Sequence, residues 1–301
     1  MKNPRAVYVS RLLGFAFVSL LLSLYVALMP CVQQETYRLV LFQPWKYPKG
    51  DYQVRSLCGV TAKDVNFKTA DGSMLHALYF KNPKGKNTVL IHHGSGMNLT
   101  LFLGYTLVFV HGGSSVFIYD YRGFGKSKGT PSWKGVLEDG QSAYNYLVND
   151  DGVPKNKLVN CGLSLGTGPA TYVSANNECA GLFLGCPYSS LRKVGKENLK
   201  YLALYPDFLF PEQDINSLEM ISKVKCPVAI LHGTNDATIH YKHSVDLFAK
   251  INAPKKLYLI DKMGHVDMLD DKFLPETMKI TQAFARDPLA STNSASRICQ
   301  K

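Results

Sequence analysis

Charged residues are scarce in this sequence of 301 residues, and no segment of it repeats. Asp, Glu, Lys and Arg together make up 19% of the chain, whereas hydrophobic residues make up 46% and include 17 Tyr and 15 Phe. This composition excludes a disordered chain, a coiled coil and a collagen-like polymer. It supplies enough apolar side chains for a sizeable core, and the length fits one large α/β domain with an appendage.

Negative charge is also in short supply, because 34 Lys and Arg face 23 Asp and Glu, which gives a net charge of +11. Residues 1–63 alone hold eight basic and two acidic residues, hence +6 of that excess. A protein that binds nucleic acid would carry its positive charge on the folded body. We therefore expect no nucleic acid partner, and we predict no particular oligomeric state.

The seven cysteines form neither a disulfide framework nor a zinc pattern. Cys161, Cys186 and Cys226 lie in or beside apolar strand-like runs, where a free thiol behaves as a small hydrophobic group. His240 and His243 have no third ligand at a metal-binding spacing. The sequence therefore predicts no metal site.

The first distinctive segment is Leu12–Met29, an uncharged run of 18 residues that as a helix would be long enough to cross a bilayer. Basic residues precede it, and its exit (ALMPC, residues 27–31) lacks the small residues that signal peptidase needs. We expect an uncleaved single-pass signal anchor over residues 1–32, with the following domain on the translocated side of the membrane. A cleaved signal peptide and a buried helix of the fold are the alternatives.

Strand-like and helix-like segments alternate over residues 64–286. Val65–Thr69 and Leu75–Phe80 flank an Asp-Gly pair, which predicts a β-hairpin. Short runs that are apolar on both faces follow, at Thr88–His92, Ser115–Asp120, Lys157–Cys161, Gly181–Gly185, Val228–His232 and Lys256–Ile260. Helical periodicity lies between them, over Leu99–Phe109, Trp133–Val148, Gly168–Ala175, His243–Ile251 and Asp271–Ala285. This alternation predicts a doubly wound α/β fold with a mostly parallel sheet.

Three segments lie outside this alternation. Residues 33–63 are expected to be a membrane-proximal linker and residues 287–301 a polar C-terminal tail. Residues 187–226 separate two consecutive strands and are interpreted as an inserted cap over the carboxyl ends of the sheet. Tyr205 and Phe208 of this cap are predicted to line a pocket for an acyl chain, although they could equally pack the cap onto the body.

A candidate catalytic serine lies in the pentapeptide Gly162-Leu163-Ser164-Leu165-Gly166, which directly follows a strand-like run and precedes a helix-like one. A nucleophilic serine at a strand-to-helix bend needs a strained backbone, and glycines two residues to either side relieve the crowding there. The helix that follows points its first N–H groups at the serine, which favours a negatively charged oxygen. We predict that Ser164 is a nucleophile.

Partners for such a serine follow in the chain. Asp236 comes directly after one late strand, and His265 comes after the next. In the order Ser, Asp, His, the histidine would take the serine proton and the carboxylate would hold the imidazole in place. The backbone N–H groups of Leu165 and Ser95 are the predicted oxyanion-hole donors, with Gly96 as the alternative to Ser95.

Five motifs, HHGSG, DYRGFGKSKG, GLSLG, HGTND and GH, resemble in this order those of the α/β-hydrolase superfamily. The resemblance is closest to its membrane-associated branch, which includes serine-aminopeptidase-like hydrolases and protein depalmitoylases. It covers roughly residues 60–286 and implies the α/β-hydrolase fold, with Ser164, Asp236 and His265 as the catalytic triad.

We interpret the chain as a membrane-anchored serine hydrolase that cleaves carboxylic ester or thioester bonds of small-molecule or lipid acyl substrates through an acyl-enzyme. A serine peptidase or aminopeptidase of the same fold is one alternative, and a catalytically silent scaffold is another. No cofactor is expected, since Gly125-Lys126-Ser127 resembles a phosphate loop but has Asp120 where that loop requires its first glycine.

Overall fold

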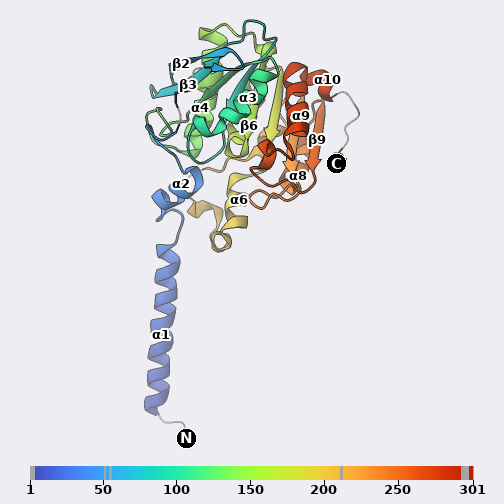
Figure 1. The fold of residues 1–301 in the computed structure, drawn as a ribbon. Coiled ribbons are helices and arrows are strands. Elements are labelled where there is room, and N and C mark those ends of the chain that lie inside the picture. The colour runs from blue at the N-terminus through green and yellow to red at the C-terminus, as the bar shows by residue number, and fades with distance from the viewer. Residues whose placement is uncertain (1–3, 51, 54–55, 211–212, 293–297, 301) are drawn as a thin grey trace.

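The computed structural model describes residues 4–50, 52–53, 56–210, 213–292 and 298–300, with side chains for all of these except 4–12 and 298–300. Helix α1 (Pro4–Ala27) projects away from the part of the molecule that holds the sheet (Figure 1). Among the residues that the structure describes with side chains, which begin at Leu13 in α1, no helix combines the length and the apolar character needed to span a bilayer. The prediction of a membrane-spanning segment over Leu12–Met29 therefore gains no support from this structure.

Within the described residues, ten strands form one sheet in the order β1-β2-β3-β5-β4-β6-β7-β8-β9-β10. The strands are β1 (Ser56–Leu57), β2 (Val60–Lys68), β3 (Met74–Phe80), β4 (Thr88–His92), β5 (Ser115–Tyr119), β6 (Leu158–Leu163), β7 (Gly181–Gly185), β8 (Val228–Gly233), β9 (Lys255–Ile260) and β10 (Ile298–Gln300). Pairing is antiparallel from β1 through β3 to β5 and parallel over the rest. The predicted hairpin and mostly parallel sheet are confirmed.

Helices cover both faces of the sheet (Figure 1). The helices after α1 are α2 (Gln34–Phe42), α3 (Leu103–His111), α4 (Trp133–Asn145), α5 (Thr167–Asn176), α6 (Leu191–Asn198), α7 (Ser217–Ile221), α8 (Lys242–Lys250), α9 (Leu274–Arg286) and α10 (Pro288–Thr292), of which α2 and α6 lie below the sheet in the view of Figure 1. Helix α3 packs against α9, and α9 against α10, while α4, α5, α7 and α8 pack in succession on the other side. Each helix predicted between strands is present, with ends displaced by a few residues.

Side chains along the strands divide between two cores because successive residues of a strand point to opposite faces. In β4, Leu90 joins the cluster beneath α4, whereas Val89 and Ile91 join the cluster beneath α3 and α9. All three side chains are fully buried. This two-sided burial explains why the parallel strands are continuous apolar runs in the sequence.

The segment expected to be a linker, residues 33–63, is instead part of the fold. Helix α2 buries Tyr37 and Phe42, and strand β2 begins at Val60 rather than at Val65. The prediction fails because this segment packs against residues that lie far along the chain. The rings of Trp133 and Phe210, for example, lie 6.0 and 5.9 Å from that of Tyr37.

The predicted C-terminal tail begins with α10, whose Pro288 and Thr292 are buried. Gly181 in β7 leaves room for this helix, since a Cβ at Gly181 would lie 2.7 Å from the Pro288 side chain. Residues 293–297 and 301 of the predicted tail lie outside the described residues.

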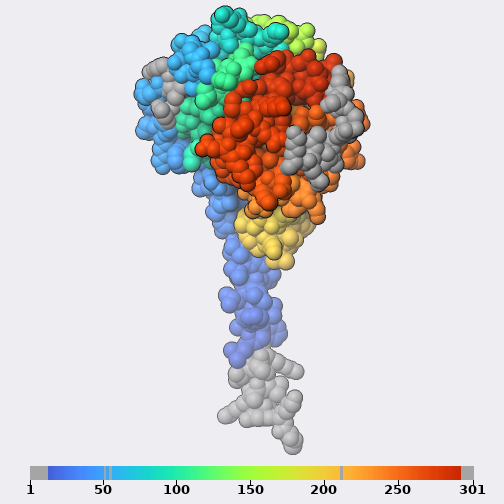
Figure 2. All heavy atoms as spheres, turned by 45° about the vertical axis from the view of Figure 1, so that its right-hand side comes forward, coloured from blue at the N-terminus to red at the C-terminus, as the bar shows by residue number. Residues whose placement is uncertain are grey.

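The predicted cap contains α6, two 3₁₀ turns (Lys200–Leu204 and Asp207–Leu209) and α7. The Tyr205 ring stacks on that of Tyr25 at 4.7 Å, and its hydroxyl donates to the Tyr25 carbonyl over 2.9 Å. Phe208 is 82% exposed. In Figure 2 this part of the chain, in gold, lies beside the upper end of α1. The cap therefore contacts the N-terminal helix through Tyr205, and the prediction that Tyr205 and Phe208 line the serine pocket is wrong.

Strand order determines where a site can form. Strand β4 lies between β5 and β6, so the connections from β4 and β6 diverge on either side of their shared carboxyl edge. Such a switch point opens a crevice at the ends of the two strands. The loop after β4 carries Ser95, and the bend after β6 carries Ser164.

Candidate active site

Ser164 stands at a sharp bend between β6 and α5. Its φ of 51° lies in the left-handed region, which is uncommon for a residue with a side chain and costs conformational energy. The serine is half-buried, and its hydroxyl points into a pocket at the carboxyl edge of the sheet. The bend thus presents the hydroxyl to the crevice between β4 and β6.

The two glycines flanking the serine are required by close backbone approach. A Cβ at Gly162 would lie 2.6 Å from the Gly166 carbonyl oxygen, and a Cβ at Gly166 would overlap the His92 carbonyl. A side chain at Gly162 would push β6 away from the start of α5, and one at Gly166 would push the bend away from the end of β4. The spacing noted in the sequence therefore has a direct steric cause.

The three predicted side chains form one hydrogen-bonded row. The Ser164 hydroxyl lies 2.9 Å from Nε2 of His265, and Nδ1 of His265 lies 2.7 Å from Oδ2 of Asp236. Since Asp236 can only accept there, the His265 proton sits on Nδ1 and Nε2 is free to accept from the serine. The His265 side chain is 16% exposed, whereas that of Asp236 is inaccessible to solvent.

Asp236 accepts four hydrogen bonds. Its Oδ1 receives the N–H groups of Thr238 and Ile239, at 2.9 and 2.8 Å. Its Oδ2 receives His265 and, at 3.1 Å, Nε2 of His232. Burial would raise the pKa of this carboxyl, but the bonds from His232, His265 and the Ile239 amide hold the pKa well below its usual value. Asp236 is therefore a carboxylate at neutral pH.

His232 also belongs to this cluster, although the sequence motifs did not predict it. It is fully buried at the end of β8, with Nε2 between Asp236 and the Ile239 carbonyl and Nδ1 2.6 Å from the Ser244 hydroxyl. Because both neighbours of Nε2 are acceptors, its proton lies on Nε2 and is donated to them. A histidine within the otherwise apolar run VAILHG, four residues before the aspartate, is the signal that could have revealed it.

The loop after β4 offers a backbone donor beside the serine. Ser95 lines the same pocket as Ser164, and its N–H meets no acceptor among the residues that the structure describes. The N–H of Gly96 donates to the Phe42 carbonyl over 2.8 Å. Gly96, the alternative donor in our prediction, is therefore already committed elsewhere. The second predicted donor, Leu165, directly follows Ser164.

The pocket over Ser164 has a volume of about 410 Å³. It lies between the loop after β4, the start of α3 and the segment after His265. Its lining residues are Gly94, Ser95, Leu101, Phe102, Tyr105, Leu163, Ser164, Gly185, Cys186, Thr238, His265, Val266, Met268 and Leu269. No described residue of 187–226 contributes to it. Apart from the serine, the histidine and the loop, the wall is mainly apolar.

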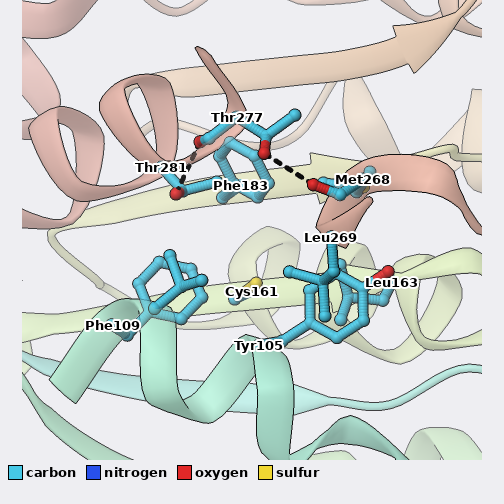
Figure 3. Close-up of a pocket in the computed structure, with 10 residues that line it drawn as sticks. Tyr105, Phe109, Cys161, Leu163, Phe183, Met268, Leu269, Thr277 and Thr281 are labelled. Atoms are coloured by element: carbon cyan, nitrogen blue, oxygen red, sulfur yellow. Dashed lines mark hydrogen bonds between the residues drawn. The ribbon is translucent and has the colours of Figure 1, made fainter. Parts of the chain in front are cut away.

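A smaller cavity continues from this pocket into the protein (Figure 3). The two share Tyr105, Leu163, Met268 and Leu269, and the inner one has only about 10 Å³ of free space. Figure 3 shows Thr277 and Thr281 at its edge, where their hydroxyls donate to the carbonyls of Met268 and Thr277 at 2.6 and 2.7 Å. The remaining inner lining is Val108, Phe109, Cys161 and Phe183. With both hydroxyls satisfied, the inner cavity presents an apolar surface.

One group of side chains could be read as a metal site: ligand atoms of Cys186, His232 and Asp236 lie within 4.8 Å of one another. The carboxylate and imidazole atoms are engaged in the hydrogen bonds described above. An ion there would have to replace the hydrogen bond between His232 and Asp236. The arrangement of His232 and Asp236 thus fits a hydrogen-bonded pair better than two ligands of a metal ion.

Several known proteins are similar to this chain in sequence or in fold. A family model described as "Serine aminopeptidase, S33" matches residues 83–222. The alpha/beta hydrolase domain-containing protein aho-3 of Caenorhabditis elegans is 33% identical over 189 residues, which cover 62% of this chain. The chain spans about half, 54%, of that relative's length. Human alpha/beta hydrolase domain-containing protein 17B is 28% identical over 206 residues, 67% of this chain and 68% of its own.

Solved structures agree on the fold. The esterase Pf2001 of Pyrococcus furiosus superimposes with a TM-score of 0.65 at 20% identity, over 76% of this chain and 92% of its own. Together these likenesses support the assignment of the chain to the α/β-hydrolase superfamily. An acetyl xylan esterase from Paenibacillus sp. R4 has the same α/β-hydrolase fold, with a TM-score of 0.61 at 18% identity over 75% of this chain and 84% of its own. The family-model match contains Ser95 and Ser164 but ends before Asp236 and His265.

We predict that Asp236→Asn destabilises this α/β-hydrolase in a pH-dependent way. The folded-state pKa of Asp236 is lowered, so its carboxylate stabilises the fold above the unfolded pKa of about 4 and loses that contribution as pH falls below it. The free energy of unfolding in urea should differ between wild type and variant by about 2–3 kcal/mol at pH 7. The difference should persist to pH 5 and shrink at pH 4 and 3.5, and a difference independent of pH would contradict the assignment.

Proposed function

We propose that this protein is a serine hydrolase that cleaves carboxylic ester or thioester bonds through an acyl-enzyme intermediate. The observation that carries the proposal is the unbroken row from the Ser164 hydroxyl through His265 to the buried Asp236 carboxylate. A half-buried serine in a left-handed bend, bonded to a histidine that is bonded to a carboxylate, is equipped for nucleophilic attack.

In the first half-reaction, Oγ of Ser164 attacks the carbonyl carbon while Nε2 of His265 takes the hydroxyl proton. The Asp236 carboxylate stabilises the imidazolium that forms, without itself accepting the proton. The N–H groups of Ser95 and Leu165 donate to the oxyanion. When the intermediate collapses, His265 returns the proton to the departing alkoxide or thiolate. Water, deprotonated by the same histidine, then releases the acid and regenerates Ser164.

Similar proteins support hydrolysis as the reaction class without fixing the bond. The matching family model is described as a serine aminopeptidase, and two structural neighbours are described as esterases. A peptidase needs polar groups to hold a peptide backbone and its N-terminus, whereas the pocket over Ser164 is mainly apolar. This favours an acyl substrate over a peptide.

The apolar wall of the pocket is the proposed acyl subsite. Leu101, Phe102, Tyr105 and Leu269 surround the space next to the serine, and the inner apolar cavity extends it towards α9. Each methylene transferred from water to such a wall contributes about 0.8 kcal/mol. The acyl chain would thus follow α3 inward, away from the cap.

We also propose that the N-terminal helix holds the enzyme at a membrane, as a single-pass anchor with the hydrolase domain on the translocated side. Leu12–Met29 carries no charge, and Leu13, Phe15 and Phe17 are each at least 60% exposed. Exposed apolar side chains along a projecting helix are costly in water and favourable in lipid.

Ser164→Ala is expected to abolish both ester turnover and covalent labelling by a fluorophosphonate probe, because the members of a triad act as a unit. His265→Ala should lose nearly as much. Ser222→Ala, at an exposed serine directly after α7 that does not line the pocket, is the control and should label like wild type. Equal labelling of Ser164→Ala and wild type would exclude Ser164 as the nucleophile, and a wild type that neither labels nor turns over would favour the scaffold alternative.

For p-nitrophenyl esters, kcat/KM should rise with acyl length beyond butanoate. Leu269→Gln places an amide in the proposed subsite and should reduce the octanoate-to-acetate ratio of kcat/KM about 10-fold, the size expected for losing one or two buried methylene contacts. Phe208→Ala, on the exposed tip of the cap, should leave the ratio unchanged. A steep preference for acetate, or release of aminoacyl amides without ester turnover, would overturn the acyl assignment.

The membrane proposal predicts that full-length protein remains in the pellet after carbonate extraction. Val18→Asp with Leu22→Asp should release it, since each charge at the centre of a spanning helix costs about 2.5–3.5 kcal/mol. Protease added to sealed vesicles whose cytoplasmic face points outward should leave the hydrolase domain intact, because that domain would lie inside them. Recovery of wild-type protein in the carbonate supernatant would contradict the anchor, and digestion in sealed vesicles would reverse its orientation.

A further inference from the structure

We infer that residues 42–47, which we call the N-terminal strap, position the oxyanion loop and so belong to the catalytic apparatus. The strap precedes the sheet in the chain, and nothing in the three-residue catalytic row requires it. The inference rests on the proposed hydrolase function, because it assigns the strap a role in stabilising the oxyanion.

Backbone hydrogen bonds join the strap to the loop directly after Ser95. The Gly96 N–H donates to the Phe42 carbonyl at 2.8 Å, and the Met97 N–H donates to the Gln43 carbonyl at 3.0 Å. In the opposite direction, the Trp45 N–H donates to the Met97 carbonyl at 2.6 Å. The loop is thereby paired with the strap in the manner of a short strand, although the two are fifty residues apart in sequence.

The other side of the strap is held as well. The Gly125 N–H donates to the Trp45 carbonyl at 2.8 Å, and the Tyr47 N–H donates to the Gly125 carbonyl at 2.9 Å. The Asn98 amide donates to the carbonyls of Trp45 and Lys49, at 3.3 and 2.6 Å. The strap therefore lies between the oxyanion loop and the turn after β5, bonded to both.

The loop needs this support because its own conformation is unfavourable. Gly96 has a φ of 80° and Met97 a φ of 58°, both left-handed, and for methionine this region carries a conformational cost. Such backbone persists only where its surroundings hold it. The strap satisfies the amides of both residues and fixes the peptide plane that follows Ser95.

The Ser95 N–H therefore lies between two parts of the loop, each of which is fixed by contacts with neighbouring residues. On one side the Tyr121 hydroxyl donates to the His93 carbonyl at 2.9 Å, and a Cβ at Gly94 would lie 3.3 Å from Cβ of Ser164. On the other side lie the bonds of Gly96 and Met97 to the strap. An oxyanion donor gains its effect from being aimed before the charge develops, so loosening one side should weaken it.

Phe42 anchors the strap. Its side chain is fully buried in the cluster that contains Tyr121, Phe124 and Trp133. Through α2 the strap continues to Tyr37, whose ring contacts Phe210 of the cap. The position of the N-terminal segment is therefore linked to the oxyanion loop by continuous packing and hydrogen bonds.

The test compares Trp45→Pro with Trp45→Ala. Proline removes the N–H that donates to Met97, whereas alanine removes the same partly exposed ring and keeps the N–H. Removing a whole oxyanion donor costs about 10²–10³-fold in kcat, so misaiming one should cost about 10-fold. We expect kcat of Trp45→Pro for a p-nitrophenyl ester, per site titrated with fluorophosphonate, to fall about 10-fold below that of Trp45→Ala, with KM within about two-fold.

A second variant covers the case in which Trp45→Pro does not fold. Asn98→Asp is nearly isosteric and keeps the oxygen that accepts from Thr100, but it loses the donation to Trp45 in the strap and the one to Lys49 just after it. It should show the same fall in kcat and a parallel loss of inhibition by an alkyl boronic acid, which forms a negatively charged tetrahedral adduct on the serine. KM should again change little.

Values of kcat per titrated site equal to that of Trp45→Ala, in every variant that folds, would mean that the strap serves stability alone and would overturn the inference. Failure of the proposed function looks different: wild type and Trp45→Ala would then neither label nor turn over ester.

Discussion

The buried carboxylate of Asp236 is the group to which the other parts of the site are tied. Three stretches of chain donate to it: His232 at the end of β8, the amides of Thr238 and Ile239 in the next loop, and His265 after β9. A charge without access to solvent is tolerable only when its lone pairs are used in this way. The same bonds that stabilise the charge fix the plane of the carboxylate, and hence the direction in which His265 faces Ser164.

Much of the fold could be predicted because its signals are local. Strands such as Thr88–His92 and Gly181–Gly185 are buried on both faces, so each is a short apolar run bounded by turn residues. The geometry of the serine bend was equally accessible, since the two glycines reflect contacts within a few residues of Ser164 and with the adjoining strand end. The order Ser164, Asp236, His265 then placed each partner after a recognisable strand.

What escaped prediction depends on contacts between distant residues. Nothing near Phe42 in the sequence indicates that its carbonyl accepts from Gly96, so residues 33–63 resembled a linker and Gly96 resembled a free donor. Tyr205 and Phe208 are aromatic residues in an inserted segment, and such residues pack equally well over a pocket or against a helix. Tyr25, 180 residues earlier, determines which of these occurs. His232 was hidden for another reason: a histidine in an apolar strand gives no indication of its hydrogen-bond partners.

The order of the site residues along the chain has a consequence for synthesis. A ribosome delivers the oxyanion loop first and Ser164 next, then Asp236 and last His265, which lies on a turn just before the final helices. Until that turn is placed, the Ser164 hydroxyl has no base to accept its proton. In the proposed hydrolase, premature termination anywhere before His265 would thus yield a product without hydrolytic capacity, because the row from Ser164 to Asp236 is complete only in a nearly finished molecule.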